Sequence, residues 1–412
     1  MDTNELQKYL ERDHEKDILA AAERLRGVLI PTPLIHSEFY SSEYGTDVFL
    51  KPEHLQATGS FKIRGAFNKI TCLSDEELAR GVVCSSAGNH AQGVAKSAMM
   101  KNINATIVMP NITPLLKVNA TKAYGAEVIL HGDVYDESYA HALGIADASG
   151  ASFIHPFDDY DVICGQGTVG LEIIEELSDA DEILVPVGGG GLISGIALIA
   201  KAIAPGVKII GVVPKGALSM KVSIDEGHVS RLAEVHTVAE GVAVKQPGDL
   251  TFAIAKRYVD DIVTVTEKDI MENVLLMIEK HKFIVETAGV VSLAGLKKRA
   301  SAGKKIVCIT SGGNIDTVTL SSIINQGMIS RGRILCFSVE LPDRPGQLVK
   351  VASMLADLGA NVIALEHNQF KVIDRYSDKV ALEITAETNG PEHIKEILDS
   401  MEDEGFVLTR IY

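Results

Sequence analysis

Between about residues 15 and 328, short apolar runs alternate with stretches of helical spacing, and this alternation constrains the fold more than any other feature. The clearest runs are apolar throughout rather than at every second position, at residues 105–110, 126–132, 181–187, 208–214 and 304–310. Strands of this kind are buried on both faces, as in a parallel sheet covered by helices. The sequence therefore predicts an α/β body of doubly wound parallel sheets.

The pattern changes after residues 325–333, a segment that contains Gly and Arg. The chain then follows strand and helix patterns in the order β-α-β-β-α-β, beginning with an alternating strand at residues 334–341. Its two middle strands are expected at residues 360–372 and 379–387. This order is typical of a ferredoxin-like domain, so residues 334–412 are expected to fold separately.

Length and composition exclude several classes of protein. A chain of 412 residues suggests two or three domains, and its net charge of −16 argues against nucleic acid as a partner. The apolar stretch at residues 183–213 contains Gly, Pro and Lys, so it is interpreted as strand, helix and strand, and no membrane contact is expected. Five spaced cysteines without a CxxC pair predict reduced thiols, a cytoplasmic location and no zinc site, at residues 72, 84, 164, 308 and 336.

The segment "GGGGLISG", at residues 188–195, directly follows an apolar run and opens a helical pattern. Glycines let the backbone approach a ligand closely, and a helix N-terminus presents free N–H groups, so the segment predicts an anion cradle suited to phosphate. No Lys-Ser/Thr pair follows, and no GxGxxG frame fits, so neither a Walker loop nor a dinucleotide fingerprint is present. A tight strand–helix turn is the alternative, but four consecutive glycines exceed what a turn needs.

Two further loops follow apolar runs. The loop "SSAGNHAQG", at residues 85–93, offers Ser86, Asn89 and His90 as hydrogen-bonding groups, and "SGGN", at residues 311–314, offers Ser311. Helix capping is the alternative reading of both loops. Because ligands of doubly wound sheets lie at the carboxyl ends of the strands, we expect both loops to lie near the glycine segment.

Lys62 lies in "GSFKIRGA", between a Gly-Ser-Phe turn and a second cation, Arg64. A lone lysine is usually a packed or surface residue, but here an anion cradle and two polar loops accompany it. The phosphate-bearing cofactor that bonds covalently to lysine is pyridoxal phosphate. Partial burial and the neighbouring Arg64 are expected to lower the pKa of Lys62 and release its amine, while Phe61 fixes the cofactor.

Four segments, "HLQATGSFKIRGAFNK", "SSAGNHAQGVA", "VPVGGGGLISG" and "TSGGN", resemble the threonine/serine dehydratase group of fold-type II pyridoxal-phosphate enzymes. Residues 334–412, with the turn "DRPGQL", resemble an ACT domain, and the combination is similar to the medium form of threonine ammonia-lyases. The resemblance implies a two-lobed, tryptophan synthase beta-like body at residues 1–328, with a small lobe inserted at about 50–150. A linker at residues 329–333 and a regulatory ACT domain follow.

The resemblance also implies the roles of individual residues. Lys62 forms the internal aldimine and later moves the Cα proton, Phe61 packs on the cofactor ring, and Asn89 binds the ring oxygen. Ser311 lies at the pyridine nitrogen. Backbone N–H groups hold the phosphate, at Gly188, Gly189, Gly190, Gly191 and Leu192. The substrate carboxylate is held by the loop residues Ser86, Ala87, Gly88, Asn89 and His90.

The activity that the resemblance implies is β-elimination of L-threonine to 2-oxobutanoate and ammonia, with L-serine to pyruvate as a weaker reaction. A serine or 3-hydroxyaspartate dehydratase and a catabolic threonine dehydratase without isoleucine inhibition are alternatives. Related serine racemases carry serine where this chain has Ala87, so racemisation should be weak. A catalytically dead amino-acid sensor and a nicotinamide oxidoreductase are less well supported, because Lys62 is intact and GxGxxG is missing.

The ACT resemblance implies an amino-acid effector, with isoleucine as the candidate, and pairing of subunits into a homodimer or homotetramer. A purely structural dimerisation domain is the alternative. The matching effector positions are Asp343, Arg344, Pro345, Gly346, Gln347, Leu348 and Asn361. Some relatives hold a divalent cation, but His236 stands where one of its acids is expected and only Glu240 matches, so no metal is predicted.

Overall fold

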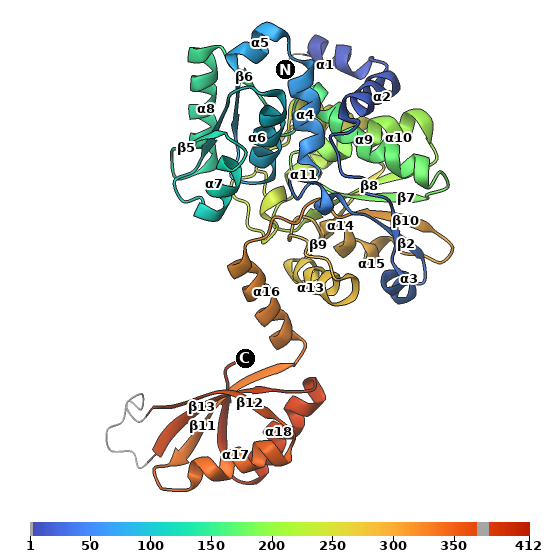
Figure 1. Cartoon of the computed structure of the whole chain (residues 1–412). Coiled ribbons are helices and arrows are strands. Elements are labelled where there is room, and N and C mark those ends of the chain that lie inside the picture. Colours follow the sequence, from blue (N-terminus) through green and yellow to red (C-terminus); the bar gives the residue numbers. More distant parts are fainter. Residues whose placement is uncertain (1–2, 369–378) are drawn as a thin grey trace. The chain divides into compact units, whose positions relative to one another are not determined.

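The computed structural model describes residues 3–368 and 379–412 of the chain. They form two compact units, Met1–Asp316 and Thr317–Tyr412 (Figure 1). The division falls at Asp316, earlier than residue 328, because helix α16 (Thr317–Ser330) belongs to the second unit. The last residue of the expected linker, Arg333, is followed directly by strand β11 (Ile334–Pro342).

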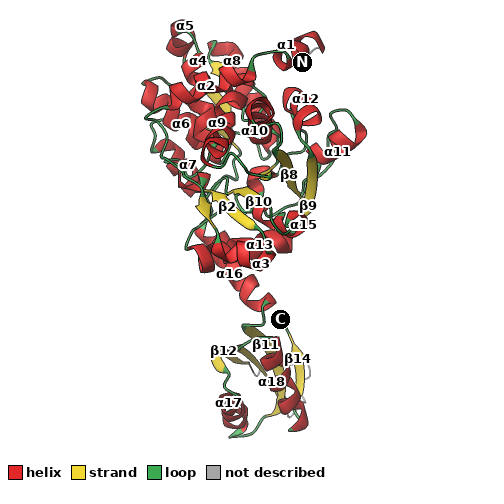
Figure 2. Cartoon of the chain, turned by 90° about the vertical axis from the view of Figure 1, so that its right-hand side faces the viewer, coloured by secondary structure: helices red, strands yellow, loops and turns green. Residues whose placement is uncertain are grey.

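The larger sheet of the first unit has six strands in the order β1-β2-β10-β7-β8-β9. All neighbouring strands are parallel except β1 and β2, which are antiparallel. Figure 2 shows its strands in yellow among the helices that cover them. The strands span Ile35–His36, Asp47–Lys51, Lys305–Ile309, Glu182–Pro186, Lys208–Pro214 and Asp261–Val265 in that order of placement. Every residue of β7 is buried, which confirms the prediction of strands covered on both faces.

The smaller sheet lies between β2 and β7 in the chain and has the order β5-β4-β3-β6, with all strands parallel. Helices α4 and α6 pack with α7 on one face of it, and α8 covers the other. The strands β3 to β6 span Val82–Ser85, Ala105–Met109, Glu127–Leu130 and Ser152–Phe153. These helices span Lys62–Cys72, Asn89–Lys101, Leu115–Lys122 and Tyr135–Ser149. Two covered parallel sheets give the two-lobed body that the family resemblance implied.

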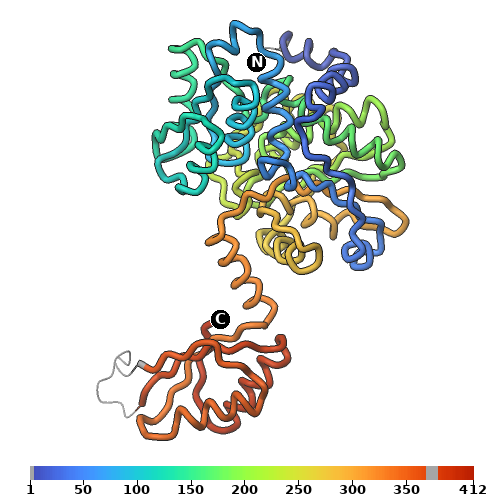
Figure 3. Tube along the Cα trace, viewed as in Figure 1, coloured from blue at the N-terminus to red at the C-terminus, as the bar shows by residue number. Residues whose placement is uncertain are grey.

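The N-terminal helix α2 (His14–Leu25) packs on α9 (Tyr160–Glu176) and α10 (Gly191–Ile203), far from it in sequence (Figure 3). Ile18 and Ala21 of α2 are completely buried in this contact. The remaining helices of the first unit are α1 (Thr3–Leu10), α3 (Glu38–Tyr44), α5 (Asp75–Arg80), α11 (Ser219–Glu226), α12 (Asp249–Tyr258), α13 (Glu267–Leu276), α14 (Val291–Ala294) and α15 (Leu296–Arg299). Short single turns span Glu53–Leu55, Glu240–Val242 and Met277–His281.

The second unit places α17 (Gln347–Asp357) and α18 (Pro391–Asp403) with a four-stranded antiparallel sheet of order β12-β13-β11-β14. After α16, the chain order β-α-β-β-α-β confirms the predicted ferredoxin-like topology. Alternate side chains of β11 and β13 form its core with both helices. The strands β12, β13 and β14 span Asn361–Asn368, Lys379–Glu387 and Val407–Arg410. Residues 369–372 of the expected strand 360–372 lie outside the described residues.

All five cysteines are free thiols, and four of them are buried. In the part of the chain that the structure describes, no helix is long and apolar enough to cross a bilayer.

Candidate functional site

The turn before Lys62 is paired with the loop after β10. Ser60 and Gly312 form an antiparallel bridge, Phe61 donates its backbone N–H to the carbonyl of Ser311 at 3.2 Å, and Gly313 donates to Gly59 at 2.8 Å. Helix α4 begins at Lys62 itself. The pairing therefore brings the first residue of α4 beside Ser311, although the two lie about 250 positions apart in the printed sequence.

The amine of Lys62 points toward the smaller lobe. Its Nζ donates a 2.8 Å hydrogen bond to the carbonyl oxygen of Pro156 and lies 5.2 Å from the ring centroid of Phe61. Burial lowers the pKa of Lys62 to about 8, while the negative charge of Glu286 opposes that change. An amine with this pKa is partly unprotonated near neutral pH, as a nucleophilic lysine requires.

Arg64 does not lower the pKa of Lys62, and that part of the prediction is wrong. The guanidinium of Arg64 is fully buried and pairs with Glu53 at 2.7 Å and with Glu172 at 2.6 Å. Its charge is therefore neutralised within α4 and its neighbours. Burial of the Lys62 amine, not a neighbouring cation, accounts for the direction of the shift.

The glycine segment opens α10 as predicted, with Gly190 at a φ of +97°, in the left-handed region. No acceptor in the described chain pairs with the backbone N–H groups of Gly188 to Leu192. A side chain on Gly189 would overlap the ring of Phe157, and one on Gly188 would lie 2.9 Å from the Cα of Val242. Unpaired N–H groups at a helix N-terminus fit a phosphate, so this segment could hold the cofactor's anionic end.

Phe157 also connects this cradle to Lys62. The residue before it, Pro156, accepts the hydrogen bond from Lys62. The Cα of Phe157 lies 3.0 Å from the position that a Cβ atom on Gly191 would take. One short loop after β6 therefore contacts both the amine and the glycine segment, so the two predicted features lie near each other.

Asn89, the first residue of α6, has both ends of its side-chain amide engaged. Its Nδ2 donates to Oε1 of Glu286 at 2.6 Å, and its Oδ1 accepts from Nδ2 of Asn314 at 2.8 Å. Burial raises the pKa of Glu286 to about 7, and the hydrogen bond from Asn89 opposes this. The loops after β3 and β10 therefore meet at Asn89, as their positions at strand ends predicted.

The side chains of the remaining residues of this loop make hydrogen bonds within the protein or carry no polar group. Ser86 accepts a hydrogen bond from the N–H of Gly88 at 3.2 Å. The side chain of His90 is buried and donates from Nε2 to the carbonyl of Ile154 at 2.9 Å, and burial together with the charge of Lys62 lowers its pKa to about 3. His90 is therefore neutral, and its side chain is engaged with the carbonyl of Ile154. Ala87 adds no polar group at its position.

Ser311 is buried, and its Oγ lies 3.5 Å from the carbonyl oxygen of Ala288, at the limit of a hydrogen bond. Its neighbours Phe61, Lys62 and Asn89, by contrast, are only partly buried. Part of each of these three residues is therefore accessible to solvent. A weakly engaged hydroxyl beside them fits a role toward a ring nitrogen of the cofactor.

Sequence reasoning missed Glu286, Pro156 and Asn314. Glu286 had a visible signal, because it is a single acidic residue within the apolar run "FIVETAGVV". A charge in such a run needs a partner or a function. Pro156 acts through a backbone carbonyl, and no local pattern marks it. Asn314 closes the loop "SGGN", but the sequence of that loop does not show its long-range contact with Asn89.

The residues of the half-matching metal pattern are engaged elsewhere. Glu240 forms an ion pair with Lys117 at 2.8 Å, and His236 lies 2.9 Å from the carboxylate of Glu234. Among the described residues, no three His, Cys, Asp or Glu side chains are grouped as metal ligands.

In the second unit, the predicted effector turn lines a cavity of about 280 Å³. The turn residues Asp343 to Leu348 are joined there by the side chains of Leu341, His367, Val380 and Leu382. Asn361 is not brought to this turn. It is paired in register with Glu387 at one end of the sheet, whereas Pro342, beside the turn, is paired with Lys379 at the other end.

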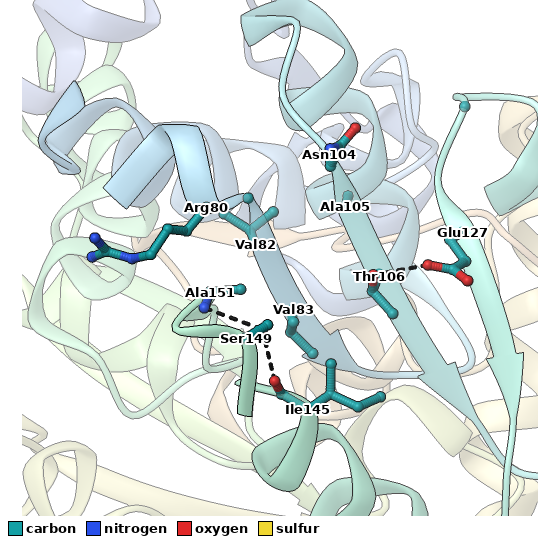
Figure 4. A pocket seen from close by; sticks show the side chains of 12 residues that line it. Arg80, Val82, Val83, Asn104, Ala105, Thr106, Glu127, Ile145, Ser149 and Ala151 are labelled. Atoms are coloured by element: carbon teal, nitrogen blue, oxygen red, sulfur yellow. Dashed lines mark hydrogen bonds between the residues drawn. The ribbon is translucent and has the colours of Figure 1, made fainter. Parts of the chain in front are cut away.

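Another cavity, of about 310 Å³, lies at the amino ends of β3 and β4 (Figure 4). Arg80 and Glu127 stand on opposite sides of it, and Thr106 donates to Glu127 at 3.3 Å. None of the residues predicted for the active site lines it. It lies at the end of the strands opposite to the loops described above.

Comparison with known proteins identifies the family. Residues 25–312 match the family model described as "Pyridoxal-phosphate dependent enzyme". The chain is 47% identical over 93% of its length, and 95% of the relative, to an L-threonine ammonia-lyase of Thermotoga maritima. It is 44% identical to an L-threonine ammonia-lyase of Geobacter sulfurreducens, over 95% of this chain and 98% of the relative.

Among solved structures, the processed form of threonine deaminase isoform 2 from Solanum lycopersicum is similar, with a TM-score of 0.73 and 42% identity. The similarity covers 79% of this chain and 94% of that one. The motifs, the fold and these relatives agree. The chain belongs to the fold-type II pyridoxal-phosphate dependent enzymes, whose cofactor is pyridoxal phosphate.

Proposed function

We propose that this chain is a threonine ammonia-lyase, which converts L-threonine to 2-oxobutanoate and ammonia. The observation that carries the proposal is the loop at residues 156–157, which contacts both the Lys62 amine and the unpaired glycine segment. A reactive amine beside a phosphate cradle is the arrangement that pyridoxal phosphate needs. The relatives in Thermotoga maritima and Geobacter sulfurreducens, matched along almost the whole chain, supply the reaction.

Each of the proposed binding residues would contact a different part of the cofactor. The N–H groups of Gly188, Gly189, Gly190, Gly191 and Leu192 would hold the phosphate. Phe61 would pack on the ring, Asn89 would donate to the ring oxygen, and Ser311 would lie at the ring nitrogen. Lys62 would hold the cofactor covalently. These roles agree with the unpaired N–H groups of the glycine segment and with the partial exposure of Phe61, Lys62 and Asn89.

When bound, pyridoxal phosphate supplies a carbonyl carbon that joins an amine and a ring that withdraws electrons from the substrate's Cα. Lys62 would take the Cα proton, because its lowered pKa leaves an amine able to accept it. Ser86, Ala87 and the backbone N–H groups of Gly88, Asn89 and His90 would hold the substrate carboxylate. Ser311 is neutral, so it would not keep the ring nitrogen protonated, which favours loss of the β-hydroxyl over reprotonation at Cα.

Elimination removes the Cα proton and the β-hydroxyl of threonine, and the resulting enamine becomes an imine that water hydrolyses to 2-oxobutanoate and ammonia. L-Serine would give pyruvate by the same steps, more weakly. Ala87 offers no base on the second face of the substrate, so we expect little racemisation. Relative turnover of threonine, serine and 3-hydroxyaspartate separates this proposal from a serine or 3-hydroxyaspartate dehydratase.

The direct test is 2-oxobutanoate formation from L-threonine by the purified chain with pyridoxal phosphate supplied. The proposal expects product from the wild type and none from Lys62→Ala. A protein that binds the cofactor but yields no 2-oxobutanoate would retain the family and exclude threonine as the substrate.

We further propose that the second unit is an ACT regulatory domain that binds an amino acid such as isoleucine. The cavity beside the turn at residues 343–348 supports this, because apolar side chains of Val380 and Leu382 line it next to the start of α17. The backbone at a helix N-terminus suits a carboxylate, and the apolar wall suits an aliphatic side chain. A threonine dehydratase of catabolic role would show no effect of isoleucine.

A homodimer or homotetramer is proposed from the edge strand β12. Edge strands carry unpaired backbone groups, and Ile363 and Leu365 of β12 are 55% and 41% exposed. If two copies pair in this way, Asn361 of one copy could reach the turn at residues 343–348 of the other copy. Five free thiols support a cytoplasmic location.

A further inference from the structure

The side-chain amide of Asn89 is held at both ends by residues that the proposed reaction does not use. Glu286 accepts from its Nδ2 at 2.6 Å, and Asn314 donates to its Oδ1 at 2.8 Å. These partners come from the segment before α14 and from the loop after β10. Asn89 is therefore fixed by two separate parts of the larger lobe.

The chemistry of the partners determines which way the amide faces. Nδ2 of Asn314 also donates to the carbonyl of Thr58 at 2.7 Å, so both of its hydrogens are used. If the amide of Asn89 were turned over, its Nδ2 would face another Nδ2 and its Oδ1 would face the carboxyl of Glu286. Only the observed orientation satisfies all three side chains.

Two glycines make room for these contacts. A side chain on Gly312 would overlap Oε1 of Glu286 and would lie 2.9 Å from Nδ2 of Asn89. A side chain on Gly59 would overlap the amide of Asn314, and Gly59 has a φ of +70°, where other residues are strained. The glycines of "GSFK" and "SGGN" thus serve this hydrogen-bond network as well as the turns.

An asparagine amide has two N–H donors, and here one of them is used by Glu286. We propose that Glu286 and Asn314 are positioning residues, which direct the second Nδ2–H of Asn89 at an oxygen acceptor in the active site. The inference rests on the proposed function, in which that acceptor is the ring oxygen of pyridoxal phosphate. It states that Asn89 meets this oxygen as a hydrogen-bond donor, so the oxygen is the acceptor in this contact.

The charged groups around Glu286 are compatible with this role. Lys62 and Lys117 stabilise its negative charge, and Glu240 opposes it. Burial raises the pKa of Glu286 to about 7, so both protonation states occur near neutral pH. A carboxyl group keeps an acceptor oxygen in either state, so the bond from Asn89 does not require the charge.

This distinction defines the test. Glu286→Gln keeps a carbonyl acceptor of the same shape, whereas Glu286→Ala removes it. The dissociation constant for pyridoxal phosphate and the visible absorption band of the bound cofactor are measured for both variants, for Asn89→Ala and for the double variant. Glu279→Ala, at an exposed residue of the preceding turn, is the matched control.

We expect Glu286→Ala to raise the dissociation constant roughly tenfold and to shift the absorption band, and Glu286→Gln to stay close to the wild type. The variants are compared at about pH 9.5, above the pKa of Lys62, because the charge of Glu286 also acts directly on the Lys62 amine. In the Asn89→Ala background at that pH, Glu286→Ala should have no further effect on either readout, because it acts through Asn89. Independent, additive effects would overturn the inference, as would a normal spectrum and affinity in Glu286→Ala.

If Glu286→Ala does not fold, Asn314→Ala addresses the same amide from its other end and is combined with Asn89→Ala in the same way. The proposal would be contradicted if Asn314→Ala changed the dissociation constant and the absorption band equally in the wild type and in the Asn89→Ala background. A wild-type chain that binds no pyridoxal phosphate would instead refute the proposed function, and it would be recognised before any variant is compared.

Discussion

Lys62 donates a 2.8 Å hydrogen bond from its amine to the carbonyl oxygen of Pro156, a residue of the smaller lobe. The same loop packs on the glycine segment through Phe157. The position of the amine is therefore set by the backbone of a loop and not by a charged partner. Several measurable consequences follow from this arrangement and from the burial around it.

Uptake of pyridoxal phosphate by the apoprotein should become faster as pH rises and level off above about pH 8. Only the neutral amine reacts with an aldehyde, and burial lowers the pKa of Lys62 to about 8. The groups that act on this pKa or respond to Lys62 are Glu286, His90 and His155. Stopped-flow absorption between pH 6 and 10 would measure the midpoint.

Glu286→Gln should move that midpoint to lower pH, because the negative charge of Glu286 raises the pKa of Lys62 against the effect of burial. A midpoint near 10.5 in the wild type would mean that the amine is not desolvated in the folded chain.

The lowered pKa of Lys62 also makes the stability of the folded chain depend on pH. Since the folded pKa is below the ordinary value, the contribution of Lys62 to stability rises between about pH 8 and 10.5.

Gly189→Ala should destabilise the chain by about 1–3 kcal/mol and weaken phosphate binding, because the new methyl group overlaps the ring of Phe157. Gly144→Ala is the control, since nothing lies within 4 Å of a side chain there and the residue is inside α8. Gly144→Ala should raise the free energy of unfolding by roughly 0.4–1 kcal/mol. Denaturant unfolding compares the two, and equal effects would contradict the close packing of the glycine segment.

Arg64→Met should destabilise the first unit by about 3–5 kcal/mol, because the fully buried Glu53 then loses the charge that compensates its burial. Burial alone would raise the pKa of Glu53, but Arg64 and Lys51 hold it below its ordinary value. This pair therefore stabilises the fold above about pH 4.5, and the contribution is lost as pH falls through the folded pKa.

The exposed pair Lys221–Asp225 provides the control for Arg64. Lys221→Met should change stability by less than about 0.5 kcal/mol in the same unfolding experiment. A tolerated Arg64→Met, with wild-type acid sensitivity, would mean that the buried ion pairs do not hold α4 in place.

His367→Ala and Asn361→Ala separate two accounts of the proposed regulation. His367 lines the cavity beside the turn at residues 343–348, whereas Asn361 lies at the other end of the sheet. If one chain forms the effector site, isoleucine inhibition is lost in His367→Ala alone, with basal threonine turnover kept. If two copies share it, both variants lose inhibition. Inhibition unchanged in both would exclude this cavity.

The sequence predicted the parts of the structure that local patterns determine. Strands β4, β7, β8 and β10 lie within a residue or two of the expected runs, because their residues are apolar on both faces. Lys62 and the glycine segment were found because their composition is unusual for a helix or a turn. The contacts that hold them were not predictable in this way.

Glu286, Pro156 and Asn314 reach the active site from distant segments, and their partners are determined by how the lobes pack. The same reason explains the error at Arg64, since adjacency in sequence suggested a charge effect on Lys62. In the structure, its side chain turns to Glu53 and Glu172. Neighbours in a helix two positions apart do not face each other.

The central claim is that Lys62 is the residue that holds pyridoxal phosphate covalently. The most direct test is borohydride reduction of the cofactor-loaded chain, followed by peptide mass spectrometry. The account predicts a pyridoxyl phosphate mass on the peptide that contains Lys62, and none on Lys62→Ala that has kept its fold. A label on another lysine, or an unchanged Lys62 peptide in a chain that turns over threonine, would contradict it.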